Sequence, residues 1–290
     1  MRRRVRSNLL VLLAPLVASA VVLGLASAPA SARPPGSGGS GVALPDSMAS
    51  TGDSITRGFD ATSSGCFLSD CPQYSWSTGT AGKSYVNSQY LRILAANRRI
   101  RGNVWNDAKT GAKMDALDGQ LRSAAAQGVQ YATVLMGAND VCTSSTSTMT
   151  PTATFQSEFQ TALTDFFATD PNAHVFVSSI PNIYQLWSLE HTNPTAEFEW
   201  QSFGICQSML SSSNTEADRQ AVVAQEQADN DALATVCAQF ANCKWDNLAT
   251  YDYAFKTSDI STVDYFHPSV SGQNTLAGIT WAAGYWPTTK

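Results

Sequence analysis

The sequence predicts an α/β protein of three layers, an α/β/α sandwich in which helices cover both faces of a central parallel sheet. Short apolar segments, clearest at 131–136 and 174–180, alternate with longer segments of helical periodicity. Continuous apolar strands are typical of parallel sheets that are buried on both faces. Polar and glycine-rich turns directly follow several of these segments, as expected where strands deliver functional loops.

Residues 1–32 are typical of a secretory signal peptide. Four arginines among the first six residues precede a long apolar run, and small residues close the segment at Ala28-Pro-Ala-Ser-Ala32. Pro15 interrupts the apolar run and no basic stop-transfer cluster follows it, which argues against a lasting membrane anchor. We therefore expect cleavage after Ala32 and a secreted, extracellular protein.

Residues 33–41 contain proline, glycine and serine around one arginine, a composition that predicts a flexible linker. The folded domain is then expected to cover 42–290, a length that suits one domain with a large core. Loss of the four signal-peptide arginines takes the net charge from −5 to −9. Such an acidic chain is not expected to bind nucleic acid. We expect a monomer that makes at most transient contact with lipid surfaces.

All six cysteines lie within the predicted domain, and an even number in an exported chain indicates three disulfides. Sequence alone leaves their connectivity open, and a sequential pairing is preferred. Zinc binding is the competing use, but the chain has no C-x-x-C pair and no histidine near the cysteines. The candidates are Cys66, Cys71, Cys142, Cys206, Cys237 and Cys243.

The first half of the domain opens with a short strand that runs into the turn Gly52-Asp-Ser-Ile55. Residues 60–82 show neither helical nor alternating periodicity and are predicted to form a long loop stapled by two of the cysteines, a kind of loop that is often functional. The pattern then predicts a helix at 84–96, a strand at 103–107 and a second helix at 114–127.

The second half continues the alternation. The strand at 131–136 delivers Gly137-Ala-Asn-Asp140 at its C-terminal end. Residues 182–214 have a weak pattern with dispersed aromatic residues; we favour an aromatic packing segment, and an insertion that shapes a substrate groove is the alternative. The remaining predicted elements are a helix at 152–168, a strand at 174–180, a helix at 215–240, a last strand at 243–248 and a closing helix at 271–284.

Ser54 is the candidate nucleophile. A serine placed where a strand gives way to a tight turn exposes its hydroxyl while backbone N–H groups face the same space. Glycine, aspartate and serine are also common in ordinary surface turns, so the turn is no proof of chemistry by itself. A catalytic interpretation requires a base from another part of the chain.

His267 is the candidate base among the three histidines. His174 begins a predicted core strand, where a structural role is expected, and His191 lies in the weakly patterned segment. Asp264 stands three positions before His267, so in a helical or turn-like segment it can accept a hydrogen bond from one imidazole nitrogen while the other points outward. A helix-capping aspartate beside an unrelated histidine gives the same pattern.

Together these residues fill every role in acyl transfer. We expect Ser54 to attack the acyl carbonyl, His267 to relay the proton, and Asp264 to fix the imidazole tautomer. The backbone N–H groups of Ser54 and Gly111 and the side-chain amide of Asn139 form the expected oxyanion hole.

Asp53 and Asp140 each neighbour a catalytic candidate, but aspartates in such turns usually accept bonds from backbone N–H groups. We therefore expect no catalytic role for either. Without a cluster of carboxylates at calcium-loop spacing, the sequence implies no metal and no cofactor.

Four segments resemble, in order, the signature blocks of the SGNH hydrolases, which are also called GDSL lipases and esterases. They are Gly52-Asp-Ser-Ile55, Asp107-Ala-Lys-Thr-Gly-Ala112, Gly137-Ala-Asn139 and Asp264-Tyr-Phe-His267. The resemblance implies a flavodoxin-like SGNH hydrolase fold, a Ser-His-Asp esterase, and the oxyanion roles of Gly111 and Asn139. Two departures, Ile55 in place of the usual leucine and Thr110-Gly-Ala in place of the more frequent Ser-Gly, touch no reacting atom.

Shorter segments are similar to the phospholipase B-like branch of that family: Tyr74-Ser-Trp-Ser-Thr-Gly79, Gly111-Ala-Lys113 and Gly137-Ala-Asn-Asp-Val-Cys142. This similarity favours a serine ester hydrolase acting on small-molecule or lipid esters, with phospholipids among the candidate substrates. The alternative is a carbohydrate acetylesterase that deacetylates polysaccharides, with tryptophans as sugar platforms. A binding domain that retains a vestigial site is the non-enzymatic alternative.

Overall fold

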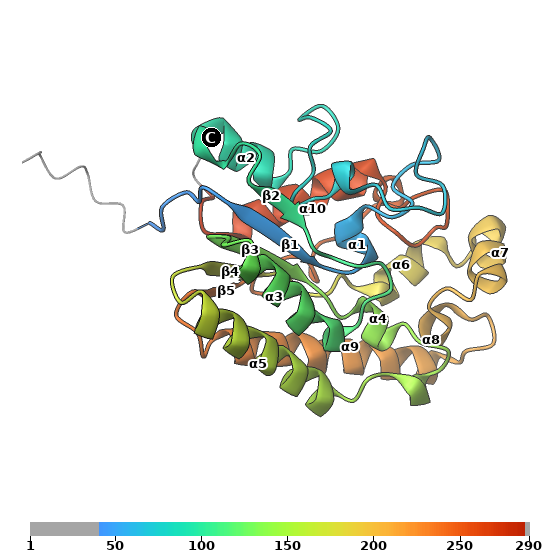
Figure 1. Cartoon of the computed structure of the whole chain (residues 1–290). Helices are drawn as coiled ribbons and strands as arrows, with labels where there is room; N and C mark the ends of the chain where they lie inside the picture. The colour runs from blue at the N-terminus through green and yellow to red at the C-terminus, as the bar shows by residue number, and fades with distance from the viewer. Residues whose placement is uncertain (1–40, 288–290) are drawn as a thin grey trace, which may run out of the picture. The chain divides into compact units, whose positions relative to one another are not determined.

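The computed structural model describes residues 41–287, so the predicted signal peptide and residues 33–40 of the predicted linker lie outside the described residues. Five parallel strands form one sheet in the order β2-β1-β3-β4-β5 (Figure 1). This is the strand order of flavodoxin-like doubly wound sheets, and it confirms the predicted fold class. The strands are β1 (Met48–Gly52), β2 (Val104–Asn106), β3 (Tyr131–Leu135), β4 (His174–Val177) and β5 (Cys243–Trp245).

The two central strands are buried along their whole length. β1 pairs with β3 from Met48 opposite Tyr131 to Gly52 opposite Leu135, and both strands end at the same level. The edge strands β2 and β5 are only half-buried, in keeping with their single neighbours. The loops that follow β1, β2 and β3 therefore leave from one edge of the sheet.

Helices lie on both sides of the sheet (Figure 1). On one side, α3 packs against β1 and against α5, and α5 packs against α9; α2 and α10 lie on the other side. The longer helices are α2 (Gln89–Ala96), α3 (Leu117–Ala126), α5 (Thr152–Thr169), α6 (Ile183–Glu190), α7 (Pro194–Ser202), α9 (Glu216–Cys237) and α10 (Val270–Ala283). Single turns form α1 (Ser54–Arg57), α4 (Ala138–Val141) and α8 (Gln207–Leu210), with 3₁₀ turns at Pro72–Tyr74, Arg98–Ile100, Met114–Ala116, Thr146–Thr148 and Thr257–Asp259.

Several element boundaries differ from the prediction; the strands expected at 174–180 and 243–248, for example, end at Val177 and Trp245. The helix expected from residue 84 begins at Gln89, because the Ser88 hydroxyl accepts the N–H of Leu91 and caps the helix there. The helix expected at 215–240 ends at Cys237. Its start was predicted within one residue, since Thr215 forms a capping box with Asp218.

The weakly patterned segment 182–214 contains α6, α7 and α8. Trp200 is fully buried, as expected of an aromatic packing segment. Phe198 and Phe203 are instead 65% and 57% exposed, and α6 contributes to a cavity described below. The burial of Trp200 agrees with the packing interpretation, and a substrate groove shaped by this segment stays a prediction.

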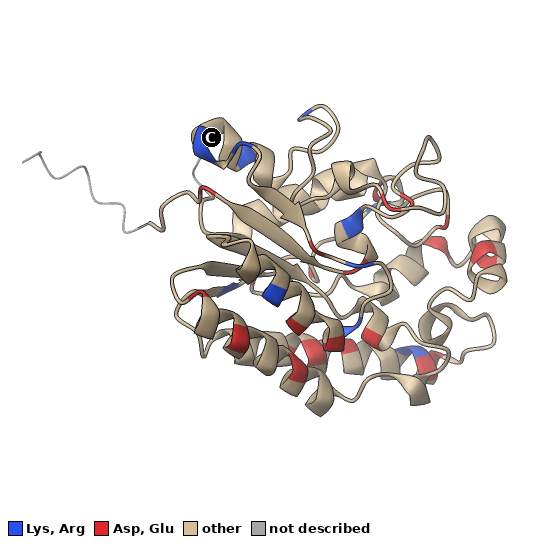
Figure 2. Ribbon diagram, viewed as in Figure 1, with Lys and Arg blue, Asp and Glu red and all other residues tan. Residues whose placement is uncertain are grey.

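Charged side chains are distributed unevenly. Figure 2 shows aspartates and glutamates along α3, α5 and α9 and on α7, while lysines and arginines are scattered over several elements. Within residues 41–287, no helix is both long and apolar enough to cross a membrane.

The six cysteines form three disulfides with the predicted sequential pairing, Cys66–Cys71, Cys142–Cys206 and Cys237–Cys243. Cys142–Cys206 closes a far longer segment than the others, and it ties the end of α4 to the start of α8. Cys66–Cys71 staples the loop that follows α1.

Removing Cys142–Cys206 is expected to destabilise the protein more than removing Cys237–Cys243. The sequence separations are 64 and 6 residues, and loop-closure entropy then gives losses of about 4 and about 2 kcal/mol in the free energy of unfolding. Urea denaturation of the two double-alanine variants without reductant measures this difference. Equal losses would show that strain or packing, rather than loop closure, sets the contribution of these disulfides.

Candidate active site

The predicted site residues meet at the carboxyl edge of the sheet. Ser54 follows β1, Gly111 follows β2 and Asn139 follows β3. The chain reverses its direction of strand addition between β1 and β3, and open α/β sheets bind their ligands at this switch point. His267 reaches the same edge from the loop that precedes α10.

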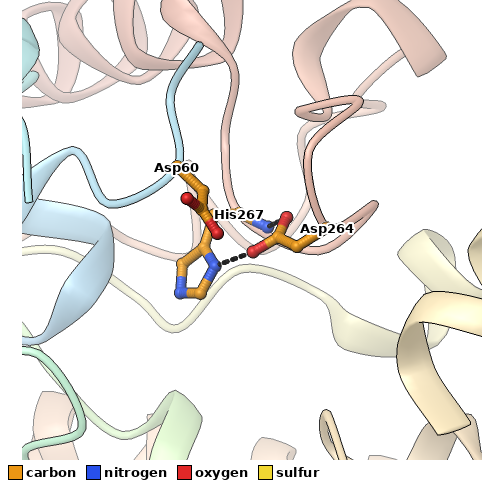
Figure 3. Close-up of side chains that lie close together, drawn as sticks. All are labelled: Asp60, Asp264 and His267. Carbon is orange, nitrogen blue, oxygen red and sulfur yellow. Dashed lines mark hydrogen bonds and ion pairs between the residues drawn. The ribbon is translucent and has the colours of Figure 1, made fainter. Parts of the chain in front are cut away.

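A continuous hydrogen-bonded chain links the three polar residues predicted as nucleophile, base and carboxylate. The Ser54 hydroxyl lies 2.8 Å from His267 Nε2. On the other side of the ring, His267 Nδ1 contacts a carboxylate oxygen of Asp264, as Figure 3 shows. The backbone of Tyr265, at φ +54°, bends the segment between them. The side chains of His267 and Asp264 are only 12% and 5% exposed, so their contact is largely shielded from water.

The surroundings raise the pKa of His267. Burial by itself lowers the pKa of His267, but the Asp264 carboxylate, with Asp53 and Asp60 nearby, raises it above its ordinary value. Burial favours a higher pKa for Asp264, yet His267 and the N–H groups of Phe266 and His267, each at 3.0 Å, bring it below its ordinary value. The aromatic rings of Phe59 and Phe266 lie 5.0 Å from the imidazole, centroid to centroid.

The turn that presents Ser54 is fixed by its neighbours. Gly52 has φ +139°, and a Cβ there would lie 2.2 Å from the carbonyl oxygen of Leu135, so only glycine fits. The Asp53 carboxylate accepts the N–H of Ile55 and caps α1. From α3, the Gln120 amide accepts the Gly52 N–H at 2.7 Å and donates to the Gly52 carbonyl at 2.9 Å.

Gly111 and Asn139 lie on loops that contact each other. Gly111 has φ +79° within a turn closed by the Ala112 N–H and the Lys109 carbonyl, a conformation that favours glycine. Asn139 donates one amide hydrogen to the Ala112 carbonyl at 3.0 Å, and a second amide hydrogen remains. The backbone N–H groups of Ser54 and Gly111 donate no hydrogen bond to any group within residues 41–287.

Asp70 supports the Gly111 loop, a role that sequence reasoning missed. Its carboxylate accepts the Thr110 hydroxyl and the Arg57 guanidinium, the latter at 2.9 Å. Asp70 lies in the stapled loop, so it joins that loop to α1 and to the segment that carries Gly111. Neither Gln120 nor Asp70 carries a motif that could have identified it.

Asp53 and Asp140 accept backbone N–H groups, in keeping with the expected structural roles. Asp140 accepts the N–H of Met114 at 3.0 Å. Burial raises the pKa of Asp53 to about 7 and that of Asp140 to about 6, well above the ordinary pKa of an aspartate. Both side chains thus favour their neutral forms more than an exposed aspartate does.

An apolar cavity adjoins the site. Its wall includes Ile55, Ala138, Phe266 and Pro268, which are direct chain neighbours of Ser54, Asn139 and His267. The rest of the wall comes mainly from the segment after β4, from α6 and from the chain before and within α10: Pro181, Asn182, Ile183, Gln185, Leu186, Leu189, Phe255, Asp259, Ile260 and Leu276.

Comparison of the sequence with family models gives one decisive result. The model of the GDSL-like lipase/acylhydrolase family matches residues 51–274, from the end of β1 into α10. The chain belongs to this family. The chain is accordingly an ester hydrolase, and the resemblance of its four motif segments is confirmed at the level of the family. A search among curated proteins found no match.

Solved structures share the fold at low sequence identity. A protein named as a GDSL-like lipase from Parabacteroides merdae is 14% identical, with a TM-score of 0.51 over 84% of this chain and 95% of that one. An extracellular lipase from Streptomyces rimosus is 16% identical, with a TM-score of 0.43 over 82% and 99%. A family 3 carbohydrate esterase from Clostridium thermocellum is 14% identical, with a TM-score of 0.45 over 83% and 94%. The likeness to the Parabacteroides merdae structure is one of fold, and at 14% identity it indicates no particular substrate.

Replacing Gln120 by leucine is expected to lower both stability and turnover. The change leaves the buried N–H and carbonyl of Gly52 without their amide partner, which costs about 1–3 kcal/mol in the free energy of unfolding. It also frees the turn that holds Ser54. Urea denaturation and ester hydrolysis measure the two effects, with Ser123→Ala on the exposed side of α3 as the control. Unchanged turnover in a destabilised Gln120→Leu protein would contradict a positioning role for Gln120.

Proposed function

We propose that the protein is an exported serine esterase that cleaves acyl esters of lipids with Ser54, His267 and Asp264 as its catalytic triad. The observation that carries the proposal is the continuous hydrogen-bonded chain from the Ser54 hydroxyl through His267 to Asp264. The export signal at residues 1–32 and the three disulfides support a location in an oxidising compartment outside the cell.

The reaction follows from the geometry. Neutral His267 donates from Nδ1 to Asp264 and accepts the Ser54 proton at Nε2 as the Ser54 oxygen attacks the ester carbonyl carbon. The negative oxygen of the tetrahedral intermediate accepts hydrogen bonds from the Ser54 and Gly111 N–H groups and from Asn139. His267 then gives its proton to the departing alcohol, and a water activated in the same way releases the acid.

The proton relay predicts an acid limit to activity. His267 must be neutral to accept the Ser54 proton, and its pKa is raised. Activity therefore falls as the pH drops through that raised pKa, at a higher pH than an ordinary histidine would give.

The apolar cavity supports a lipid substrate. Its lining is predominantly aliphatic and aromatic, and it begins at residues adjacent to the nucleophile and the base. An acyl chain gains free energy by leaving water for such a wall, at about 0.8 kcal/mol for each buried methylene. A sugar ring, by contrast, needs several polar partners.

Exposed apolar side chains support contact with a lipid surface. Phe67 and Leu68, at the tip of the stapled loop, are 62% and 48% exposed. The N–H of Leu68 is held by Asp60, whose carboxyl faces His267 and Asp264, so this apolar tip stands near the site. Transient contact with a lipid surface would bring the substrate to Ser54.

Ser54→Ala is expected to abolish hydrolysis without unfolding the protein, because the alanine has no hydroxyl to attack. Asn139→Ala is expected to lower kcat by about 100- to 1,000-fold, because it removes one oxyanion donor. Hydrolysis of a p-nitrophenyl ester, with circular dichroism as the check on folding, measures both. Full activity of Ser54→Ala would exclude the proposed nucleophile.

The length of the acyl chain separates lipid from acetylated glycan substrates. We expect p-nitrophenyl esters of medium and long chains, and phospholipids in vesicles, to be cleaved faster than the acetate or acetylated xylan. Leu186→Gln, in the cavity wall, is expected to slow long-chain esters roughly tenfold, through about 1–2 kcal/mol of lost apolar contact. The acetate then serves as the matched control. Activity restricted to acetyl groups would favour the carbohydrate esterase.

A further inference from the structure

Asp60 is a buried carboxyl next to the triad that the proposed mechanism leaves unused. It follows α1, directly after Phe59, and its backbone takes the left-handed conformation at φ +54°. Its N–H donates to the Ser69 carbonyl at 3.2 Å, and its own carbonyl accepts the Ser261 hydroxyl. Its side chain is fully buried. Figure 3 shows one carboxyl oxygen of Asp60 pointing toward the contact between His267 and Asp264.

The two oxygens of this carboxyl are in different situations. Oδ1 accepts the N–H of Leu68 in the stapled loop. Oδ2 is buried and has no hydrogen-bond partner within residues 41–287. One ligand atom each from Asp60, Asp264 and His267 lie within 4.8 Å of one another. A buried, ionised carboxylate oxygen without a hydrogen-bond partner costs free energy, and a proton on that oxygen removes most of this cost.

Two carboxylates in one buried site do not ionise independently, since their repulsion raises the pKa of one of them. Asp264 is the one held ionised, because its Oδ1 accepts two backbone N–H groups and its Oδ2 faces His267. Asp60 has a single N–H donor. Burial and the neighbouring Asp264 raise the pKa of Asp60 to about 6.

We propose that Asp60 is a positioning residue of the triad, which in its protonated form donates a hydrogen bond toward Asp264 and in its ionised form stabilises the protonated imidazole of His267. The inference rests on the proposed Ser-His-Asp function. It deepens that function by adding a second carboxyl that acts through Asp264 and His267 and touches no reacting atom. Because the Leu68 N–H donates to the Asp60 carboxyl, the stapled loop helps to hold Asp60 beside Asp264 and His267.

A bound metal ion is the competing interpretation of three such residues. Both imidazole nitrogens of His267 already have partners, Nδ1 in Asp264 and Nε2 in Ser54. Both oxygens of Asp264 are likewise engaged by N–H groups. A metal ion would have to break the hydrogen bonds that link Ser54, His267 and Asp264. A proton shared between the carboxyls of Asp60 and Asp264 therefore explains the cluster better.

The charges that face His267 come from three segments. Asp53 caps α1, Asp60 follows α1, and Asp264 precedes His267 in its own loop; all three raise the pKa of His267, and burial opposes them. Replacing Asp60 by asparagine removes one of these carboxyls. The asparagine side chain keeps an oxygen that accepts the Leu68 N–H. Its amide N–H takes the place of the carboxyl proton that points toward Asp264.

The first test is an NMR titration of the His267 imidazole, assigned by the signal that His267→Gln removes. In Asp60→Asn the titration midpoint is expected to move to lower pH by roughly half a unit or more, because a neighbouring negative charge is lost. Asp252→Asn, which removes an exposed carboxylate outside the cluster, is the matched control and should leave the midpoint unchanged. An unchanged midpoint in Asp60→Asn overturns the proposal, as does a midpoint that shifts on EDTA treatment and returns with Zn²⁺.

The second test is the pH profile of kcat/KM on a p-nitrophenyl ester. Asp60→Ala is expected to lose activity by on the order of 10- to 100-fold, as misplaced catalytic groups do. Asp60→Asn should restore most of it and move the acid limb to lower pH. If Asp60→Asn is as impaired as Asp60→Ala, the proposal fails. The NMR titration needs no turnover, whereas Ser54→Ala tests the esterase mechanism without Asp60, so the two hypotheses fail separately.

Discussion

The parallel pairing of β1 with β3 is the constraint on which the site depends. Because Gly52 lies opposite Leu135, both strands end at the same level, and the segments carrying Ser54 and Asn139 leave the sheet side by side. The approach is so close that no side chain fits at Gly52. A shift of one residue in this pairing would turn every buried side chain of β1 to the opposite face, so the packed core also fixes the register.

Side chains that bond to the backbone carry the positioning outward from the sheet. Gln120 on α3 holds the peptide groups of Gly52, two residues before Ser54, and Asp140 holds the start of the 3₁₀ turn before α3. The loop after α1 contributes at two points: Asp70 binds Thr110 beside Gly111, and Asp60 binds Leu68 beside the triad. A long loop without periodicity therefore supports the site through two of its carboxyls.

Burial sets the electrostatics of this edge. Several carboxyls lie in low-dielectric surroundings, where the charged form is costly unless a partner compensates it. Asp264 has such partners and its pKa is lowered, whereas those of Asp53 and Asp140 are raised. Within residues 41–287, the carboxyls that raise the pKa of His267 are those of Asp264, Asp53 and Asp60. The pKa of His267 is the balance between the attraction of these carboxyls, which raises it, and the burial of the imidazole, which lowers it.

The sequence by itself determined the fold class and predicted Ser54, His267, Asp264, Gly111 and Asn139 as site residues, since local periodicity and short motifs record these directly. It left the disulfide connectivity open, and the sequential pairing was fixed only in the tertiary structure. Helix ends such as Gln89 shifted, because a serine cap decided the boundary over the apolar pattern. Only the tertiary structure brought in Gln120, Asp70 and Asp60. Each acts on a group in another segment of the chain, through a contact that leaves no spacing or composition in its own neighbourhood. The apolar cavity likewise arises from α6 and the chain before α10, which meet only in the folded protein.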